Sequence, residues 1–322
     1  MAEFAYKFLY GKIFENNLLR STGDAFQQLV YRLFNTLYLN FEKIDVQGSL
    51  GDRKNDGYIR GQGIFYQAYG PKDSAINTTS QSTAIKKMPE DFYALKKHID
   101  SGLWEPITKY IFVFKVWRGT YPEVLETLYS LEKANPTIAF EICDIDNLLT
   151  LFNQLTLEEM AFVTNCFVPE PNFDMVSFQV MGEIIDHLIS LGGSTNLDIT
   201  KNPPDFEDKI TFNHLARIQA DNLRVASYKI EQLDDYLSSY PNNDIADYLC
   251  SIFKKLYNES LIQYPDNPIM QFQYILESCH LPDTDKRQLQ ILETNSYIMI
   301  AKYFETCDIF EEPIYDDQKS KK

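Results

Sequence analysis

The chain is poor in the residues that build disulfide scaffolds, zinc modules and membrane spans. Its five cysteines are scattered over 322 residues without a CxxC pair, and its four histidines show no HxH or HExxH spacing. This argues against a disulfide framework or a zinc module and indicates a reducing compartment. No run approaches the roughly 20 apolar residues that a membrane span needs. The first residues include acidic side chains and lack the apolar core of a signal peptide, so we expect a soluble, cytoplasmic protein.

Basic residues are few relative to acidic ones, and the imbalance lies in the later part of the chain. The sequence holds 30 Lys and Arg against 46 Asp and Glu, a net charge of −16. Residues 1–120 carry 16 basic and 12 acidic residues, whereas residues 121–322 carry 14 and 34. Nucleic-acid binding needs cations that neutralise phosphates, so the mildly basic first part is the candidate for it. The acidic part either keeps the protein in solution or binds a partner.

The first half of the chain alternates helical and strand-like segments. A 3.6-residue apolar stripe from Phe26 to Leu37 predicts a helix that Ser21 or Thr22 could cap. The apolar, aromatic and β-branched segment 110–117 predicts a buried central strand. Further strands are expected at 41–46, from Asp56-Gly57, at 63–69 and at 137–142, with further helices at 85–99, 124–131 and 145–155. This order predicts a mixed sheet flanked by helices, in a domain of residues 1–165.

Strand-like segments disappear in the second half. A helical stretch runs from Met175 to Leu191 and ends at Gly192-Gly193, as helices commonly do. Long helical segments follow, with breaks near Pro241, between Pro265 and Pro268, and near Pro282. We expect an all-α domain over residues 166–315 and a disordered tail over 316–322.

The segment GDRKNDGYIRGQGIFYQAYGPKD, residues 51–73, has the residue types of a metal-binding hairpin. Asp56-Gly57 opens one short strand, and the next strand carries Gln67 and Tyr69. Because side chains alternate across a strand, Phe65, Gln67 and Tyr69 are expected on one face. An Asp and a second oxygen ligand at a strand end can hold a hard divalent cation against a phosphate.

This hairpin and the order of elements resemble the PD-(D/E)XK, or restriction-endonuclease-like, nucleases. The resemblance implies such a nuclease domain, acting on double-stranded DNA with Mg²⁺ or Mn²⁺ bound by Asp56 and Gln67. It places Gln27 where the first helix of the family supplies a Glu or Gln. It also places Tyr69 where the family has a lysine that orients or deprotonates the attacking water.

The departure at Tyr69 leaves the role of the lysine to another residue. Lys54, two residues before Asp56, and Lys72, after the second strand, are candidates, and Lys54 is favoured because the tight turn keeps it beside the metal ligand. A DNA-facing basic rim is expected from Arg60, Lys72, Lys86 and Lys87.

Structural interpretations of the same residues stay open. Asp56-Gly57 is also an ordinary hairpin entry, and Gln67 can pair across the sheet. Tyr69 can be a core residue, while Lys54 and Gln27 can be solvated.

The hairpin segment, together with PDFEDKITFN at residues 204–213, is more specifically similar to the nuclease-like subunits of Lamassu-type and other ABC-ATPase three-component antiphage defence systems. This resemblance implies an SMC-like ATPase partner, a third subunit, and a helical C-terminal domain that mediates assembly and homo-oligomer formation. The chain itself lacks GxGxxG and GxxxxGKS/T, so we do not expect it to bind nucleotide. The chain is then either a metal-dependent DNA endonuclease or a catalytically degenerate adaptor that scaffolds the ATPase complex.

Overall fold

In the computed structural model the chain divides into two compact units. The sheet unit comprises residues Tyr10–Phe167, and the helical unit comprises Met1–Leu9 together with Val168–Lys322. The structure describes residues 2–44, 55–72, 78–117, 119–193, 204–282, 284–306 and 309–313. The expected fold class, a mixed α/β domain followed by a helical C-terminal region, is confirmed.

The described part of the sheet unit contains a five-stranded mixed sheet in the order β1-β2-β3-β4-β5. β1 pairs with β2 and β2 pairs with β3 in antiparallel fashion, whereas β3 pairs with β4 and β4 pairs with β5 in parallel fashion. The parallel strands are linked through helices, as parallel crossovers require. The strands are β1 (Phe41–Lys43), β2 (Gly57–Ile59), β3 (Ile64–Tyr69), β4 (Lys109–Phe114) and β5 (Ala139–Cys143).

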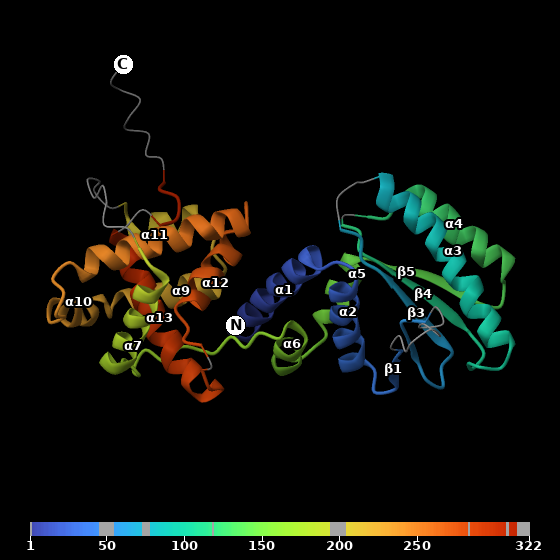
Figure 1. The fold of residues 1–322 in the computed structure, drawn as a ribbon, viewed down its shortest axis with the longest axis horizontal. Helices are drawn as coiled ribbons and strands as arrows, with labels where there is room; N and C mark the ends of the chain where they lie inside the picture. The colour runs from blue at the N-terminus through green and yellow to red at the C-terminus, as the bar shows by residue number, and fades with distance from the viewer. Residues whose placement is uncertain are drawn as a thin grey trace, which may run out of the picture. The chain divides into compact units, whose positions relative to one another are not determined.

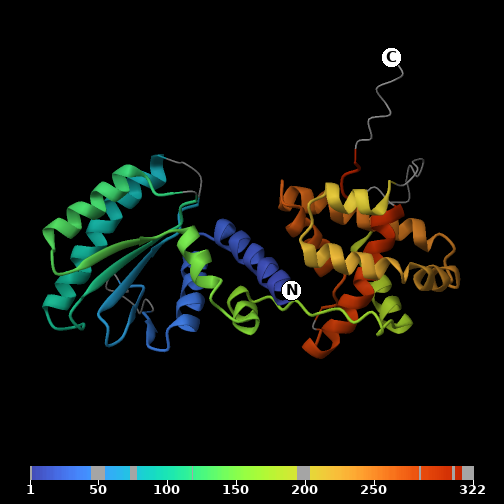
Figure 2. The same ribbon diagram turned by 180° about the vertical axis from the view of Figure 1, so that it is seen from behind.

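Helices cover both faces of this sheet. α3 and α4 lie side by side over one face, where they pack on Phe65 and on Tyr110, Phe112 and Phe114 of β4 (Figures 1 and 2). α2 covers the other face, where the Phe34 ring lies 4.5 Å from the Tyr66 ring. The helices of this unit are α1 (Ala2–Arg20, shared with the helical unit), α2 (Asp24–Leu37), α3 (Thr78–Asp100), α4 (Pro122–Ala134), α5 (Ile145–Phe152) and α6 (Leu157–Thr164).

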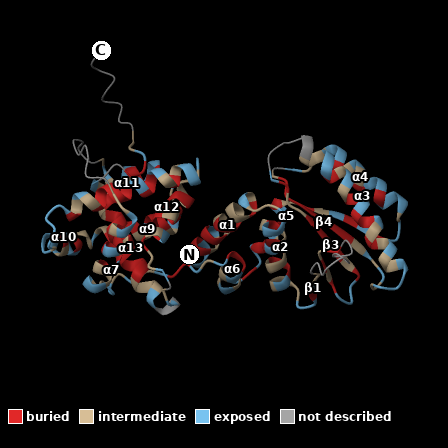
Figure 3. Cartoon of the chain, in the orientation of Figure 1, coloured by how far each residue is buried: buried red, intermediate tan, exposed pale blue. Residues whose placement is uncertain are grey.

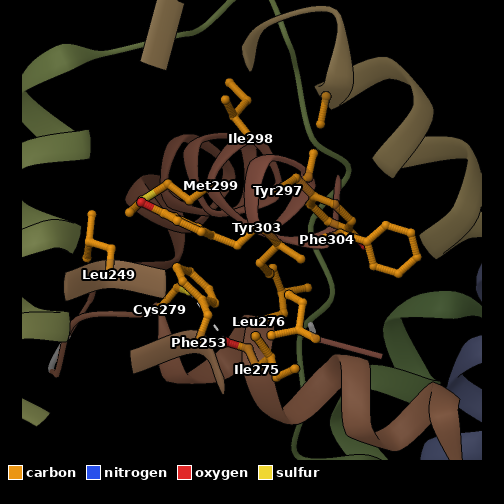
Figure 4. Packing of buried hydrophobic residues seen from close by; sticks show 14 of the residues in the cluster. Leu249, Phe253, Ile275, Leu276, Cys279, Tyr297, Ile298, Met299, Tyr303 and Phe304 are labelled. Carbon is orange, nitrogen blue, oxygen red and sulfur yellow. Dashed lines mark hydrogen bonds between the residues drawn. The ribbon is translucent and has the colours of Figure 1, made fainter. Parts of the chain in front are cut away.

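The helical unit is built around its last helix, α13. Buried side chains of α13 meet those of α11 and α12 in one apolar cluster, with Phe253 stacked on Tyr303 at 4.8 Å (Figure 4). Figure 3, coloured by burial, shows buried residues along α11, α12 and α13. The expected breaks near Pro241, Pro265 and Pro282 lie between helices, and Pro268 is the first residue of α12. The helices are α7 (Phe178–Leu191), α8 (Phe206–Phe212), α9 (Arg217–Ser227), α10 (Ile230–Ser238), α11 (Ile245–Gln263), α12 (Pro268–Ser278) and α13 (Lys286–Thr306).

Across the described residues, none of the helices combines the length and the apolar character needed to cross a membrane.

Candidate functional site

Asp56 immediately precedes β2, and its side chain makes the hydrogen bond that follows the last backbone pair between β2 and β3. Its backbone N–H donates to the Tyr66 carbonyl at 3.2 Å, and its Oδ2 accepts from the Ala68 backbone N–H at 2.7 Å. The carboxylate thus takes the place that a strand carbonyl would have. The preceding Asn55 fixes the turn, because its Oδ1 accepts from the Gly57 N–H at 3.1 Å.

Two side-chain amides reach the same oxygen of Asp56. Gln67 Nε2 donates to Asp56 Oδ2 at 2.8 Å, and Gln27 Nε2 lies 3.4 Å from it. The first turn of α2 is held beside the end of β3, where the Gly23 N–H donates to the Gly70 carbonyl at 2.9 Å. The fold therefore brings together three of the site residues predicted from the sequence: the amides of Gln27 and Gln67 meet at one carboxylate oxygen of Asp56.

Tyr69 packs away from this cluster. Its ring stacks on Phe114 at 5.7 Å and lies 6.4 Å from Phe112, in the apolar cluster under α3 and α4. Phe65 belongs to the same cluster, so Phe65 and Tyr69 share a face as expected, whereas Gln67, the third residue expected there, is bonded to Asp56. In this position the tyrosine acts as a packing residue.

The residues predicted to supply positive charge are spread over the unit. Lys54 lies outside the described residues, and Lys72 is exposed just after β3. Arg60 is exposed in the β2–β3 turn, at the far end of the hairpin from Asp56. Lys86 is exposed on α3, whereas Lys87 forms an ion pair with the buried Asp91 at 2.5 Å. α3 covers the face opposite to α2, so these two lysines do not join the Asp56 cluster.

A cavity of about 220 Å³ opens beside Asp56 on the α2 face of the sheet. Sequence reasoning missed Lys43, which lines it from β1 and whose Nζ lies 3.3 Å from Gln28 Oε1. Burial raises the pKa of the Tyr66 phenol well above its ordinary value, so this lining residue stays neutral at physiological pH. The polar residues that line the cavity are Asp24, Gln27, Gln28, Tyr31, Lys43, Asp56 and Tyr66.

With the Gln67 amide reversed, the residues around Asp56 would offer a divalent cation one carboxylate and one amide oxygen. Within the described ranges no group of three His, Cys, Asp or Glu side chains is placed to hold a metal ion. Mg²⁺, however, is often held by one or two carboxylates and completed by water and substrate phosphates. Gln67 is 2% exposed, and its Oε1 has no hydrogen-bond partner among the residues described. Reversing this amide would turn its oxygen toward Asp56, an arrangement that a cation between the two oxygens would stabilise.

The second motif, PDFEDKITFN, builds a structural joint in the helical unit. Asp205 caps α8 by accepting from the Glu207 and Asp208 N–H groups. The buried Lys209 donates to the Phe304 carbonyl at 2.9 Å, near the end of α13. Asn213 exchanges hydrogen bonds with the backbone of Glu311. These residues hold α8 against the last turns of α13 and the segment that follows it, so we assign the motif a structural role.

Searches of curated proteins and of solved structures give no match to this chain. Residues 180–311, which run from α7 to just beyond α13, match the model of C-terminal domain 10 of the ABC-three component (ABC-3C) systems. The PDFEDKITFN segment lies inside this range. Residues 180–311 of the helical unit are therefore similar to a C-terminal domain of the ABC-three component systems.

Proposed function

We propose that this chain is a nuclease subunit of an ABC-three component defence complex and that its sheet unit cleaves double-stranded DNA with a divalent metal ion. The observation that carries this proposal is the meeting of Gln27, Gln67 and the Ala68 N–H on one oxygen of Asp56, beside a cavity. The sequence of elements from α2 to β4 supports it, because it follows the restriction-endonuclease-like order of helix, three strands, helix and strand.

The residues of the cluster divide into two metal ligands and two groups that hold the Asp56 carboxylate in place. Asp56 and the amide oxygen of Gln67 would hold Mg²⁺ or Mn²⁺, which when bound supplies Lewis-acid chemistry at a phosphate. The Ala68 N–H and the Gln27 amide hold the Asp56 carboxylate in place at the mouth of the cavity. The acidic helical unit would bind the SMC-like ATPase and the third subunit, and would mediate self-association. We place the complex in the cytoplasm.

A second function, a degenerate nuclease fold that only scaffolds the ATPase complex, is favoured by two observations. Tyr69, at the position of the family lysine, is stacked on Phe114 and occupied in packing. Asp56 Oδ2 already accepts hydrogen bonds from three donors, which satisfies the carboxylate without a metal.

Nicking of supercoiled plasmid separates the two functions. The full chain, purified with its partner subunits, is incubated with Mn²⁺ as wild type, Asp56→Asn or Glu42→Gln, the last being a matched control on an exposed acid of β1. Nicking by the wild type and the control, lost in Asp56→Asn, supports the nuclease. Nicking that survives Asp56→Asn overturns the site. Absence of nicking and of calorimetric Mn²⁺ binding, with the complex intact, selects the scaffold.

A further inference from the structure

Lys43 lies next to Asp56 through strand pairing. In the antiparallel register of β1 and β2, Lys43 is opposite Gly57, the residue that follows Asp56. The pairing continues one step further, where the Ile44 N–H lies 3.4 Å from the Asp56 carbonyl. Neighbouring strands are about 4.8 Å apart, so the Lys43 backbone lies beside that of Asp56-Gly57, and Lys43 and Asp56 line the same cavity.

The Lys43 side chain is directed to the α2 face of the sheet. Phe41, two residues earlier on β1, packs its ring on Phe34 and Tyr66 on that face, and residues two apart on a strand share a face. Lys43 Nζ lies 5.2 Å from the centroid of the Tyr31 ring and 3.3 Å from Gln28 Oε1. Both contacts come from α2, the helix that also supplies Gln27 to the cavity.

The lining of the cavity thus combines a cationic side chain, Lys43, with a potential metal ligand, Asp56. The cavity volume of about 220 Å³ is many times the roughly 10–15 Å³ that one water needs in the same measure, which leaves room for a phosphate group. Lys115, another lysine near the end of β3, cannot serve, because it is fully buried and donates to the Leu19 and Ser21 carbonyls.

We propose that Lys43 is the catalytic cation of the Asp56 site: its ammonium binds the phosphodiester that is cleaved. This inference rests on the proposed nuclease function and extends it, because it assigns to β1 the charge that Tyr69 does not supply. The ammonium offsets the negative charge that develops on the phosphate oxygens. The site is then assembled from α2, β1 and the β2–β3 hairpin.

Lys43→Met, Lys43→Arg and the control Lys97→Met test this assignment in the full chain with its partners. Lys97 is exposed on α3, over the opposite face, and its loss changes the net charge equally. Binding of a short DNA duplex is measured with Ca²⁺ in place of Mn²⁺ at several salt concentrations, and nicking is measured with Mn²⁺. Thermal unfolding and calorimetric Mn²⁺ binding show that each variant keeps its fold and its metal.

We expect Lys43→Met to lower the nicking rate by about 10²-fold or more, as removal of a transition-state charge partner does. It should reduce the slope of log affinity against log salt by about 0.9, the loss of one phosphate contact. Lys43→Arg should keep the salt slope, and Lys97→Met should nick like the wild type. Nicking by Lys43→Met at the control rate overturns the assignment of Lys43 and leaves the nuclease intact. A wild type that does not nick refutes the proposed function, and an unchanged salt slope in Lys43→Met then refutes Lys43 as a phosphate contact as well.

Discussion

The side-chain nitrogen of Gln67 donates to Asp56 Oδ2 at 2.8 Å, while the oxygen of the same amide is buried without a hydrogen-bond partner among the described residues. An unpaired buried oxygen costs free energy, about 1–3 kcal/mol in typical cases. A cation that coordinates this oxygen and Asp56 would remove this cost, which links metal binding to the stability of the hairpin.

Gln67→Glu tests this link. Without metal, the new carboxylate lies buried beside Asp56, and we expect the variant to be less stable than the wild type by about 3 kcal/mol in EDTA, as for an uncompensated buried charge. With Mn²⁺, the second carboxylate should strengthen binding, so Mn²⁺ should raise the urea midpoint more in Gln67→Glu than in the wild type. Gln67→Met, which is similar in volume and uncharged, should gain nothing from Mn²⁺. Equal responses to Mn²⁺ in all three proteins would contradict a metal site here.

The sequence was sufficient for the order of elements from α2 to α5, because each of these elements carries a local signal, whereas α1 was not expected. The apolar stripe from Phe26 to Leu37 is α2, and the aromatic run from Tyr110 is β4. β4 ends at Phe114, short of the expected Trp117, because the chain turns there, with the Val116 N–H bonded to the Phe114 carbonyl. The helix α6 was missed although Thr156 and Glu159 form a capping box that the sequence displays.

The candidate site was predictable only in part. Asp56 and Gln67 are separated by ten residues, with Asp56 just before β2 and Gln67 on β3, so a hairpin brings them together. Lys43 could not be selected from the sequence, because its place depends on the register of β1 against β2 and on the position of α2. The packing of Tyr69 on Phe114 depends likewise on the parallel pairing of β3 and β4.

Gly70→Ala should destabilise the sheet unit. A Cβ at Gly70 would lie 2.6–2.8 Å from three atoms of the Phe26 side chain, which is itself buried and has little freedom to move. Overpacking of this kind costs about 1–3 kcal/mol, and the shift of α2 should also weaken the approach of Gln27 to Asp56. Gly11→Ala, in the interior of α1, is the matched control, because the added Cβ would lie at an ordinary contact distance of 3.7 Å from Asn153 Oδ1. That variant should gain about 0.5–1 kcal/mol. Urea unfolding of the two variants should therefore shift in opposite directions.

Lys209→Met should destabilise the helical unit although it adds an apolar side chain to a buried position. Lys209 is 1% exposed, donates to the Phe304 carbonyl and lies 5.0 Å from the centroid of the Phe304 ring. Methionine leaves that carbonyl without this donor, a loss of about 1–3 kcal/mol. Arg217→Met removes the same charge from an exposed side chain on α9, and surface changes usually stay within about 0.5 kcal/mol. Equal urea midpoints for the two variants would show that the motif at residues 204–213 does not hold α13 through Lys209.

The buried carboxyl of Glu293 makes the stability of the helical unit depend on pH. Burial raises the pKa of Glu293, while its hydrogen bond and charge interaction with His280, at 2.8 Å, lower it, and Glu277 on α12 raises it again. The net pKa lies above the ordinary value of 4.5. The folded state therefore binds this proton more tightly than the unfolded chain does, and stability from this group decreases as pH rises between the two pKa values.

Glu293→Gln removes that titration and keeps the shape of the side chain. At a pH below 4.5 both proteins carry a neutral group at position 293, and we expect a small difference in their free energy of unfolding. As the pH rises through the raised pKa of Glu293, the wild type loses stability and the variant does not, so the difference should grow in favour of Glu293→Gln and then level off. The hydrogen bond and charge interaction with His280 oppose this trend because they stabilise the ionised carboxylate, so His280→Gln in the wild-type background should enlarge the loss. Urea unfolding at a series of pH values between 4 and 8 measures each curve. Parallel curves for the wild type and Glu293→Gln would mean that Glu293 does not titrate differently in the folded chain.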